Sequence, residues 1–286
     1  MRRRSEVSSV AVVTDSTAYL PDGPEALGVR VVPLRVQLGA RTATDGVDVT
    51  PAEVVSALKE KVAVSTSRPS PAEFAAVYRE CLAAGADRIV SIHLAAPLSG
   101  TWESAVLASQ DFAHGVVRVV DSRSTAMGLG FAVMAAAEAA RSGAPASEVQ
   151  GRVTEVVDRT RTLFYVDTLE YLRRGGRIGT AAAVLATGLS VKPLLQMVEG
   201  QIVALEKVRT PARAIARLQQ LTVEAAGSGP VDVAIHHLQA GVRADTLAVN
   251  LRAAIPALGE LHVAELGPVL GAHLGPGALG TVVVRR

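Results

Sequence analysis

The residues best suited to binding chemistry are Ser99, Gly100 and Thr101, which stand between two patterned segments. The apolar, β-branched run 88–94 predicts a buried parallel strand, and a helical pattern begins at Trp102. Ser99 takes the N-cap position, and Gly100 allows a ligand to approach the backbone. Because a helix N-terminus carries unpaired N–H groups and partial positive charge, this turn suits a carboxylate or a phosphate. The alternative is that Ser99 only caps its own helix.

Two further predicted strands, residues 10–13 and 116–120, also end in turns that carry hydroxyl groups, at 14–17 and 121–125. In a parallel α/β sheet, such turns share the edge formed by the carboxyl ends of the strands, where these folds bind ligands. Each turn taken singly is a helix cap. Taken together, the three turns predict a polar rim.

The elements that would position this rim follow an α/β pattern. A second strand is predicted at 29–38, interrupted at Pro33. Thr50 and Ser70 each precede a proline and stand three residues before a glutamate, which predicts capped helices starting at 51 and 71. Residues 64–69 between them form a predicted hydroxyl-rich loop. The elements predicted after residue 142 are a helix to 161, a strand at 162–166, a helix at 181–189, a hairpin of 194–198 and 201–205, strands at 231–236 and 261–264 around a helix near 246–254, and a strand at 282–284. The length of 286 residues leaves two domains or one large α/β unit as the possibilities.

Composition limits the classes of protein to consider. The 286 residues are 49% hydrophobic but only 3% aromatic, so the core must be built from Ala, Val and Leu. The net charge of +2, without an aromatic-interleaved basic surface, argues against nucleic-acid binding, and the basic start Arg2-Arg3-Arg4 is expected to be a disordered tail. The single cysteine, Cys81, falls within an apolar helical pattern and fits a packed thiol in a reducing compartment. Neither the short apolar run at 10–13 nor the Ala-rich stretches predict a signal peptide or stable membrane insertion, so we expect a cytoplasmic protein.

The sequence lacks the common catalytic motifs. It contains no P-loop, no G-x-S-x-G nucleophile elbow and no H-E-x-x-H, and its acidic residues lack metal-loop spacing. His236 and His237 close a strand, which predicts one buried and one exposed imidazole. His273 stands among glycines at 271, 275, 277 and 280, which suggest a backbone held close to something. A histidine in that setting could donate a hydrogen bond to an anion.

Six segments in the same order resemble the DegV family, the fatty-acid-binding proteins that include FakB. They are Val13-Thr14-Asp15-Ser16-Thr17, Thr66-Ser67-Arg68-Pro69-Ser70-Pro71, Ser91-Ile92-His93 through Leu98-Ser99-Gly100-Thr101, Leu169-Glu170-Tyr171-Leu172-Arg173-Arg174-Gly175-Gly176-Arg177-Ile178, Val191-Lys192-Pro193-Leu194, and His273-Leu274-Gly275-Pro276-Gly277-Ala278-Leu279-Gly280. The resemblance implies two domains, an N-terminal three-layer α/β/α domain with a parallel sheet over residues 1–160 and a C-terminal α/β domain with a mixed sheet over residues 161–286. One long-chain fatty acid would be buried between them.

The resemblance also implies which residues meet the ligand and its partners. Thr66 and Ser99 would hydrogen-bond the acyl carboxylate, with His273 beside it. Such proteins present the carboxyl group to a separate, FakA-type fatty-acid kinase and carry the acyl phosphate toward an acyltransferase of phospholipid synthesis. They have no cofactor and are carrier subunits, not enzymes. Three arginines that stand around the glycine pair at 175–176 would form the face for the kinase or the phosphate; they are Arg173, Arg174 and Arg177. The alternative for them is a solvated helix end.

One position departs from the family's usual loop, because Arg68 replaces a glutamine. A cation there would either tighten carboxylate binding or point to solvent.

A tail of ~14 methylenes at about 0.8 kcal/mol each corresponds to roughly 11 kcal/mol of gross transfer free energy, so an aliphatic tunnel would retain such a ligand.

The alternative function is a stand-alone hydrolase or phosphotransferase that uses Ser99 as its nucleophile.

Overall fold

The computed structural model describes residues 9–185 and 192–286. The strands are β1 Val10–Asp15, β2 Val29–Val32, β3 Arg35–Leu38, β4 Arg41–Thr44, β5 Val64–Ser67, β6 Arg88–His93, β7 Val117–Asp121, β8 Thr160–Tyr165, β9 Lys192–Val198, β10 Gln201–Val208, β11 Val231–His237, β12 Leu258–Glu265 and β13 Leu279–Arg285. The helices are α1 Pro24–Leu27, α2 Pro51–Lys59, α3 Pro71–Ala83, α4 Thr101–Ser109, α5 Met127–Arg141, α6 Ala146–Arg159, α7 Glu170–Arg174, the 3₁₀ turn η1 Gly179–Ala181, α8 Ala182–Leu185, α9 Pro211–Ala226, α10 Gly241–Ala254 and α11 Pro268–Leu274.

The residues pack as two compact units. Unit 1 comprises the described residues up to Pro33, Arg68–Thr125 and Leu129–Asp158. Unit 2 comprises Leu34–Ser67, Ala126–Gly128 and Arg159–Arg286. Both units are therefore discontinuous in sequence, whereas the sequence analysis divides the chain once, at residue 160.

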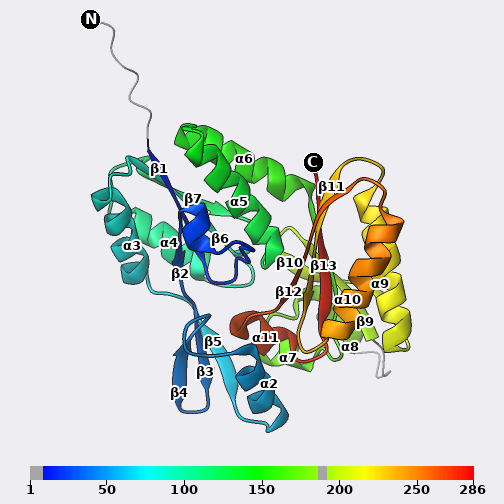
Figure 1. The fold of residues 1–286 in the computed structure, drawn as a ribbon. Helices are drawn as coiled ribbons and strands as arrows, with labels where there is room; N and C mark the ends of the chain where they lie inside the picture. The colour runs from blue at the N-terminus through cyan, green and yellow to red at the C-terminus, as the bar shows by residue number, and fades with distance from the viewer. Residues whose placement is uncertain (1–8, 186–191) are drawn as a thin grey trace, which may run out of the picture. The chain divides into compact units, whose positions relative to one another are not determined.

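Unit 1 is built on a four-stranded parallel sheet in the order β2-β1-β6-β7. Alternate residues of β1 face opposite sides of this sheet. Val12 packs in a core with α5 and α6, whereas Val13 packs with Phe74 and Tyr78 of α3 and with α4 (Figure 1). Cys81 is buried in this second core, as expected. The three-layer α/β/α arrangement predicted for the N-terminal part is confirmed.

The larger sheet of unit 2 has six strands in the order β10-β9-β8-β13-β11-β12. Only β11 and β12 pair in parallel, so the sheet is mixed, as predicted. The predicted hairpin is formed by β9 and β10, which turn at Glu199 and Gly200. One face of the sheet packs against α9 and α10 through apolar residues such as Leu194, Leu218 and Leu247.

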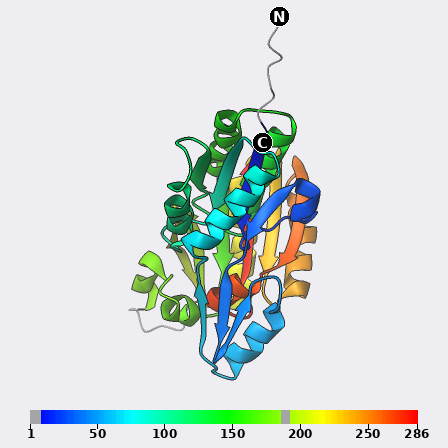
Figure 2. The same cartoon turned by 90° about the vertical axis from the view of Figure 1, so that its left-hand side faces the viewer.

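Unit 2 also contains a three-stranded antiparallel sheet, β4-β3-β5. The helix α2 lies beside these strands in both views of the molecule (Figure 2). Leu34, Val36 and Leu58 share an apolar cluster with Val269 and Ala272 of α11. This cluster joins a segment from the first quarter of the chain to one near its end.

Several local expectations are confirmed. Thr50 and Ser70 form complete capping boxes with Glu53 and Glu73, in which the hydroxyl accepts from the glutamate N–H and the glutamate accepts from the cap N–H. Pro33 lacks the N–H that a ladder needs, and it separates β2 from β3, which join different sheets.

Other expectations are wrong. Residues 64–67 form the edge strand β5 instead of a loop. His273, for which the sequence analysis predicted no secondary structure, lies in the helix α11. The helix α9 has no counterpart in the sequence analysis. The predicted helix 181–189 is confirmed for residues 182–185, which form α8, while Ala181 ends the 3₁₀ turn η1 and residues 186–189 lie outside the described residues. Across residues 9–185 and 192–286, no helix is both long and apolar enough to cross a membrane.

Candidate functional site

Ser99 lies in the turn between β6 and α4, in unit 1. The N-cap of α4 is Gly100, and no side chain caps this helix, so the expectation that Ser99 occupies the N-cap position is wrong by one residue. The partly buried Ser99 hydroxyl instead accepts a 3.3 Å hydrogen bond from the Thr101 N–H. Its oxygen also lies 2.8 Å from the Thr101 hydroxyl. The first turn of α4 therefore carries two adjacent hydroxyl groups.

A fully buried carboxylate, Asp15, holds the ends of β1 and β6 together. One of its oxygens accepts from the Thr17 N–H at 3.0 Å and from the Thr17 hydroxyl at 2.6 Å. The other accepts from the Leu94 N–H at 2.9 Å and lies 3.1 Å from Nδ1 of His93. Four donors therefore surround this side chain, and they offset the cost of removing its charge from water.

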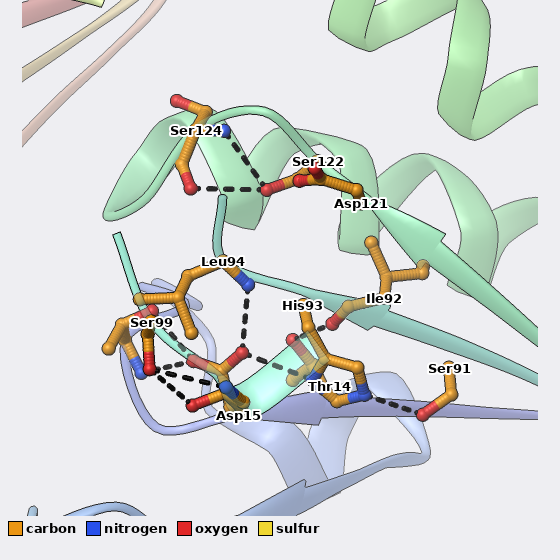
Figure 3. A network of polar contacts seen from close by, with 12 residues as sticks. Thr14, Asp15, Ser91, Ile92, His93, Leu94, Ser99, Asp121, Ser122 and Ser124 are labelled. Atoms are coloured by element: carbon orange, nitrogen blue, oxygen red, sulfur yellow. Dashed lines mark hydrogen bonds and ion pairs between the residues drawn. The ribbon is translucent and has the colours of Figure 1, made fainter. Parts of the chain in front are cut away.

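The same network continues into the core of unit 1 through His93. Its Nε2 lies 2.6 Å from the Ser91 hydroxyl (Figure 3). The Ser91 hydroxyl in turn accepts from the Tyr78 hydroxyl at 2.8 Å. Burial raises the pKa of Tyr78, so its hydroxyl stays protonated and keeps donating. Ser91, His93 and Tyr78 are fully buried, so this serine–histidine–aspartate series is a structural network and not an exposed nucleophile.

The end of β7 joins the rim through backbone contacts. The Ser122 N–H donates to the His93 carbonyl at 3.0 Å, and the Ala95 N–H donates to the Ser124 carbonyl at 2.8 Å. The Ser122 hydroxyl donates to the Ser124 carbonyl at 3.2 Å (Figure 3). The three polar turns therefore meet at one edge of the parallel sheet, as predicted, and many of their polar groups satisfy one another.

Sequence reasoning identified the turn at 14–17 but gave no role to Asp15, Ser91 or His93. One available signal was the polar pair Ser91 and His93, two residues apart in an otherwise apolar strand. Residues at this spacing share a face of the strand, so they required a buried polar partner.

Thr66 and His273 meet in unit 2. The Thr66 hydroxyl at the middle of β5 lies 2.8 Å from Nε2 of His273 in α11. Loss of contact with water, together with the positive charge of Arg177, lowers the pKa of His273 to about 4. The imidazole is therefore neutral at pH 7. With its proton on Nε2 it donates to Thr66, and the threonine hydroxyl is then left to donate to a ligand.

The expected close approach of the glycine backbone occurs between two segments of unit 2. A Cβ on Gly175 would overlap the His273 ring, and a Cβ on Gly275 would overlap the ring of Tyr171. A Cβ on Gly277 would likewise overlap the carboxylate of Asp167. We call this arrangement the α7–α11 interlock. It fixes the His273 ring against the backbone that follows α7.

The three arginines of the proposed partner face have different environments. Arg173 and Arg174 both form ion pairs with Glu170, at 2.9 and 2.7 Å, and both are exposed. These contacts lower the pKa of Glu170, which keeps it ionised. Arg177 is only partly exposed and donates to the Gly175 carbonyl. Arg173 and Arg174 are thus available to a partner, and Arg177 adds positive charge near His273.

The structure brings together Thr66 and His273 and places Ser99 in unit 1. Their roles toward a ligand stay predictions. Ser99 contacts Thr101, and within residues 9–185 and 192–286 it contacts no imidazole. This disfavours Ser99 as the nucleophile of a stand-alone hydrolase.

No cluster of three or more potential metal ligands occurs among the described residues. His236 is buried, and its Nε2 accepts from the Met127 N–H at 3.1 Å, while His237 is partly exposed.

Comparison with known proteins gives the relationship of the whole chain. The DegV family model, described as "Uncharacterised protein, DegV family", matches residues 9–286. A DegV domain-containing protein of Streptomyces coelicolor is 50% identical, over 97% of this chain and 99% of its own length. The structure of a fatty-acid-binding DegV family protein from Thermus thermophilus superposes with a TM-score of 0.92 at 36% identity, and covers 97% of this chain and 100% of its own. DegV of Bacillus subtilis, a fatty acid binding protein, gives a TM-score of 0.89 at 32% identity, with coverage of 98% and 100%. This chain belongs to the DegV family.

Proposed function

We propose that the protein binds one long-chain fatty acid and presents its carboxyl group to a separate fatty-acid kinase, then carries the acyl phosphate toward phospholipid synthesis. The observation that carries the binding step is the near-complete structural match to two fatty-acid-binding DegV proteins at 36% and 32% identity. The protein itself acts as a carrier in this proposal, and the kinase supplies the nucleotide chemistry.

The hydrogen-bond donors of the two units support a carboxylate ligand. A buried carboxylate needs several donors, because leaving it unpaired costs several kcal/mol. Ser99 and Thr101 offer hydroxyls at the start of α4, and Thr66 offers a hydroxyl that His273 orients. We assign Ser99 and Thr66 to the acyl carboxylate, and His273 to the orientation of Thr66.

The first experiment is native mass spectrometry of the purified protein, followed by solvent extraction. We expect one fatty acid per chain, and the extract identifies its length and saturation. A mass equal to that of the bare chain, unchanged after incubation with palmitate and oleate, would overturn the proposal. Covalent labelling of Ser99 by a fluorophosphonate would favour the hydrolase instead.

The head-group assignment is tested by the double substitution Thr66→Ala and Ser99→Ala. We expect it to lose bound fatty acid, because two of the carboxylate's donors are removed. The matched control is Thr42→Ala with Ser109→Ala, which removes a hydroxyl from β4, at the other edge of the same three-stranded sheet, and another from the far end of α4. A double variant as fully loaded as this control would exclude Thr66 and Ser99 as the carboxylate donors.

The partner face is tested by charge reversal at Arg173. We expect Arg173→Glu to reduce kinase-dependent acyl phosphorylation and to leave fatty-acid binding unchanged. The control is Arg152→Glu on α6, because Arg152 is equally exposed (59% against 57%) and also pairs with a glutamate three residues away. Phosphorylation at the control rate would remove Arg173 from the partner face.

A further inference from the structure

Arg68 lies over the turn that carries Ser99. It follows β5 directly and belongs to unit 1, like the turn itself. Its guanidinium packs on Gly100, where any side chain would overlap it. One nitrogen, Nη1, donates to the Gly100 carbonyl at 3.3 Å and to Glu103 at 2.9 Å. The positive charge of Arg68 is thereby held beside the residue that follows Ser99.

The guanidinium keeps unused donors in this position. Both of its described hydrogen bonds use Nη1, so within the described part of the chain the Nε and Nη2 groups donate to no protein atom. These two nitrogens form the edge that binds a phosphate or carboxylate through two parallel hydrogen bonds. The side chain is 49% exposed and Glu103 is 63% exposed, so the pair is open to exchange with an incoming anion.

The charge of the ligand decides whether such an exchange is favourable. Glu103 carries one negative charge and already offsets the positive charge of Arg68, so a singly charged carboxylate gains little at the open Nε–Nη2 edge. A phosphate group carries about −1.5 to −2 charges at pH 7 and three acceptor oxygens. It therefore competes for the open edge of Arg68 more strongly than a carboxylate does.

We infer that Arg68 is a specificity residue that favours a phosphate head group over a carboxylate at the Ser99 turn. The inference rests on the proposed function, in which both forms of the ligand occur. Glu103 opposes this preference, because it holds Arg68 by a competing ion pair. Binding thus strengthens after the carboxyl group has been phosphorylated, which favours retention of the acyl phosphate.

The test compares two ligands with the same alkyl tail, palmitate and pentadecylphosphonate, and the phosphonate resists hydrolysis. Affinities are measured by calorimetry on the delipidated full-length protein. We expect Arg68→Gln to weaken phosphonate binding about tenfold and palmitate binding less than twofold. Glu103→Gln, which releases Arg68, should strengthen phosphonate binding. The control is Arg79→Gln, since Arg79 is similarly exposed (62%) and pairs with Asp111 in the same unit.

Equal effects of Arg68→Gln on the two ligands, or an effect no larger than that of Arg79→Gln, would overturn the inference. Phosphonate binding weakened by Glu103→Gln would also contradict it. These results are distinct from failure of the proposed function, in which the unsubstituted protein binds neither palmitate nor the phosphonate.

Discussion

Asp15 shows how a single buried charge organises one edge of the parallel sheet. It accepts from the backbone and side chain of Thr17, from the Leu94 N–H and from His93, so it connects two strands that are separated by 72 residues in the chain. Every position around the carboxylate is occupied by a donor. The carboxylate therefore cannot be replaced by a group that also donates.

We predict that Asp15→Asn destabilises the protein by about 3 kcal/mol. One carboxylate oxygen is replaced by an NH₂ group, which cannot accept the hydrogen bonds that the surrounding donors made to that oxygen. Urea unfolding measures the change. The control is Asp22→Asn, since Asp22 is exposed. A loss no greater than that of the control would show that the network contributes little to stability.

Because two buried imidazoles have lowered pKa values, we expect the protein to lose stability in acid. Burial lowers the pKa of His236 to about 4, and burial with the charge of Arg177 lowers the pKa of His273 to about 4, against an ordinary value of 6.5. Because the folded state disfavours protonation, their contribution is complete above pH 6.5 and decreases as the pH falls toward 4. The slope is about 1.4 kcal/mol per pH unit for each group across that window.

The measurement is the urea midpoint between pH 7.5 and 4.5, for the unsubstituted protein and for His273→Gln. We expect the variant to be less stable at pH 7.5 but to lose less stability on acidification. Identical pH profiles would show that His273 does not titrate in this window.

At the scale of elements, the α7–α11 interlock explains the two glycine-rich segments. The ring of His273 packs against Gly175, and the ring of Tyr171 packs against Gly275. Gly175 has an ordinary helical φ of −73°, so space, and not backbone conformation, requires glycine there. Gly176 differs, because its φ of +72° is left-handed and nothing lies near its absent Cβ.

We predict that Gly175→Ala displaces His273 from Thr66 and weakens fatty-acid binding at least tenfold. Gly176→Ala is the matched control, because it strains the backbone by roughly 1 kcal/mol but leaves the His273 ring in place. The two variants are compared by unfolding and by palmitate affinity. Equal palmitate affinities of the two variants would show that the position of the His273 ring does not affect ligand binding.

Local signals predicted most elements but not all. The capping boxes at Thr50 and Ser70 are complete within four residues, so the sequence alone suffices for them. Thr210 and Pro211 start α9 with only part of this signal, because residue 213 is an arginine and no glutamate completes the capping box. The strand β5 was missed because its two serines and one threonine are typical of a loop, and only pairing with β3 reveals the strand.

The site was predictable only in part, because its contacts join distant residues. Asp15 and His93 are 78 positions apart, and Thr66 and His273 are 207 apart. The resemblance to the DegV family indicated Thr66 and His273 as neighbours of one ligand, but not their mutual hydrogen bond. The glycines around His273 indicated a close approach of the backbone but not its partners, which are side chains packed against the helix α11 and the turn after it.

At the scale of the whole molecule, the chain alternates between its two units. Leu34–Ser67 packs with the C-terminal part, and the chain returns to unit 1 at Arg68. A single division at residue 160 would therefore leave β3, β4, β5 and α2 in a fragment without α11. The apolar cluster that they share would then be exposed in both fragments.

We predict that fragments 1–160 and 161–286, expressed separately, do not unfold cooperatively, in contrast to the full chain. Thermal unfolding followed by circular dichroism measures this difference. Sharp transitions in both isolated fragments would show instead that residue 160 is a true domain boundary.

The joining of β3, β4, β5 and α2 with α11 also sets an order of events during synthesis on the ribosome. Ser67 leaves the ribosome roughly 200 residues before Val269, which at about 5–20 residues per second is a delay of about 10–40 s. During this interval the apolar side chains of Leu34, Val36 and Leu58 lack their α11 partners. The nascent chain therefore exposes this apolar surface until translation is nearly complete. We expect a chaperone to bind the nascent chain at the segment Leu34–Ser67.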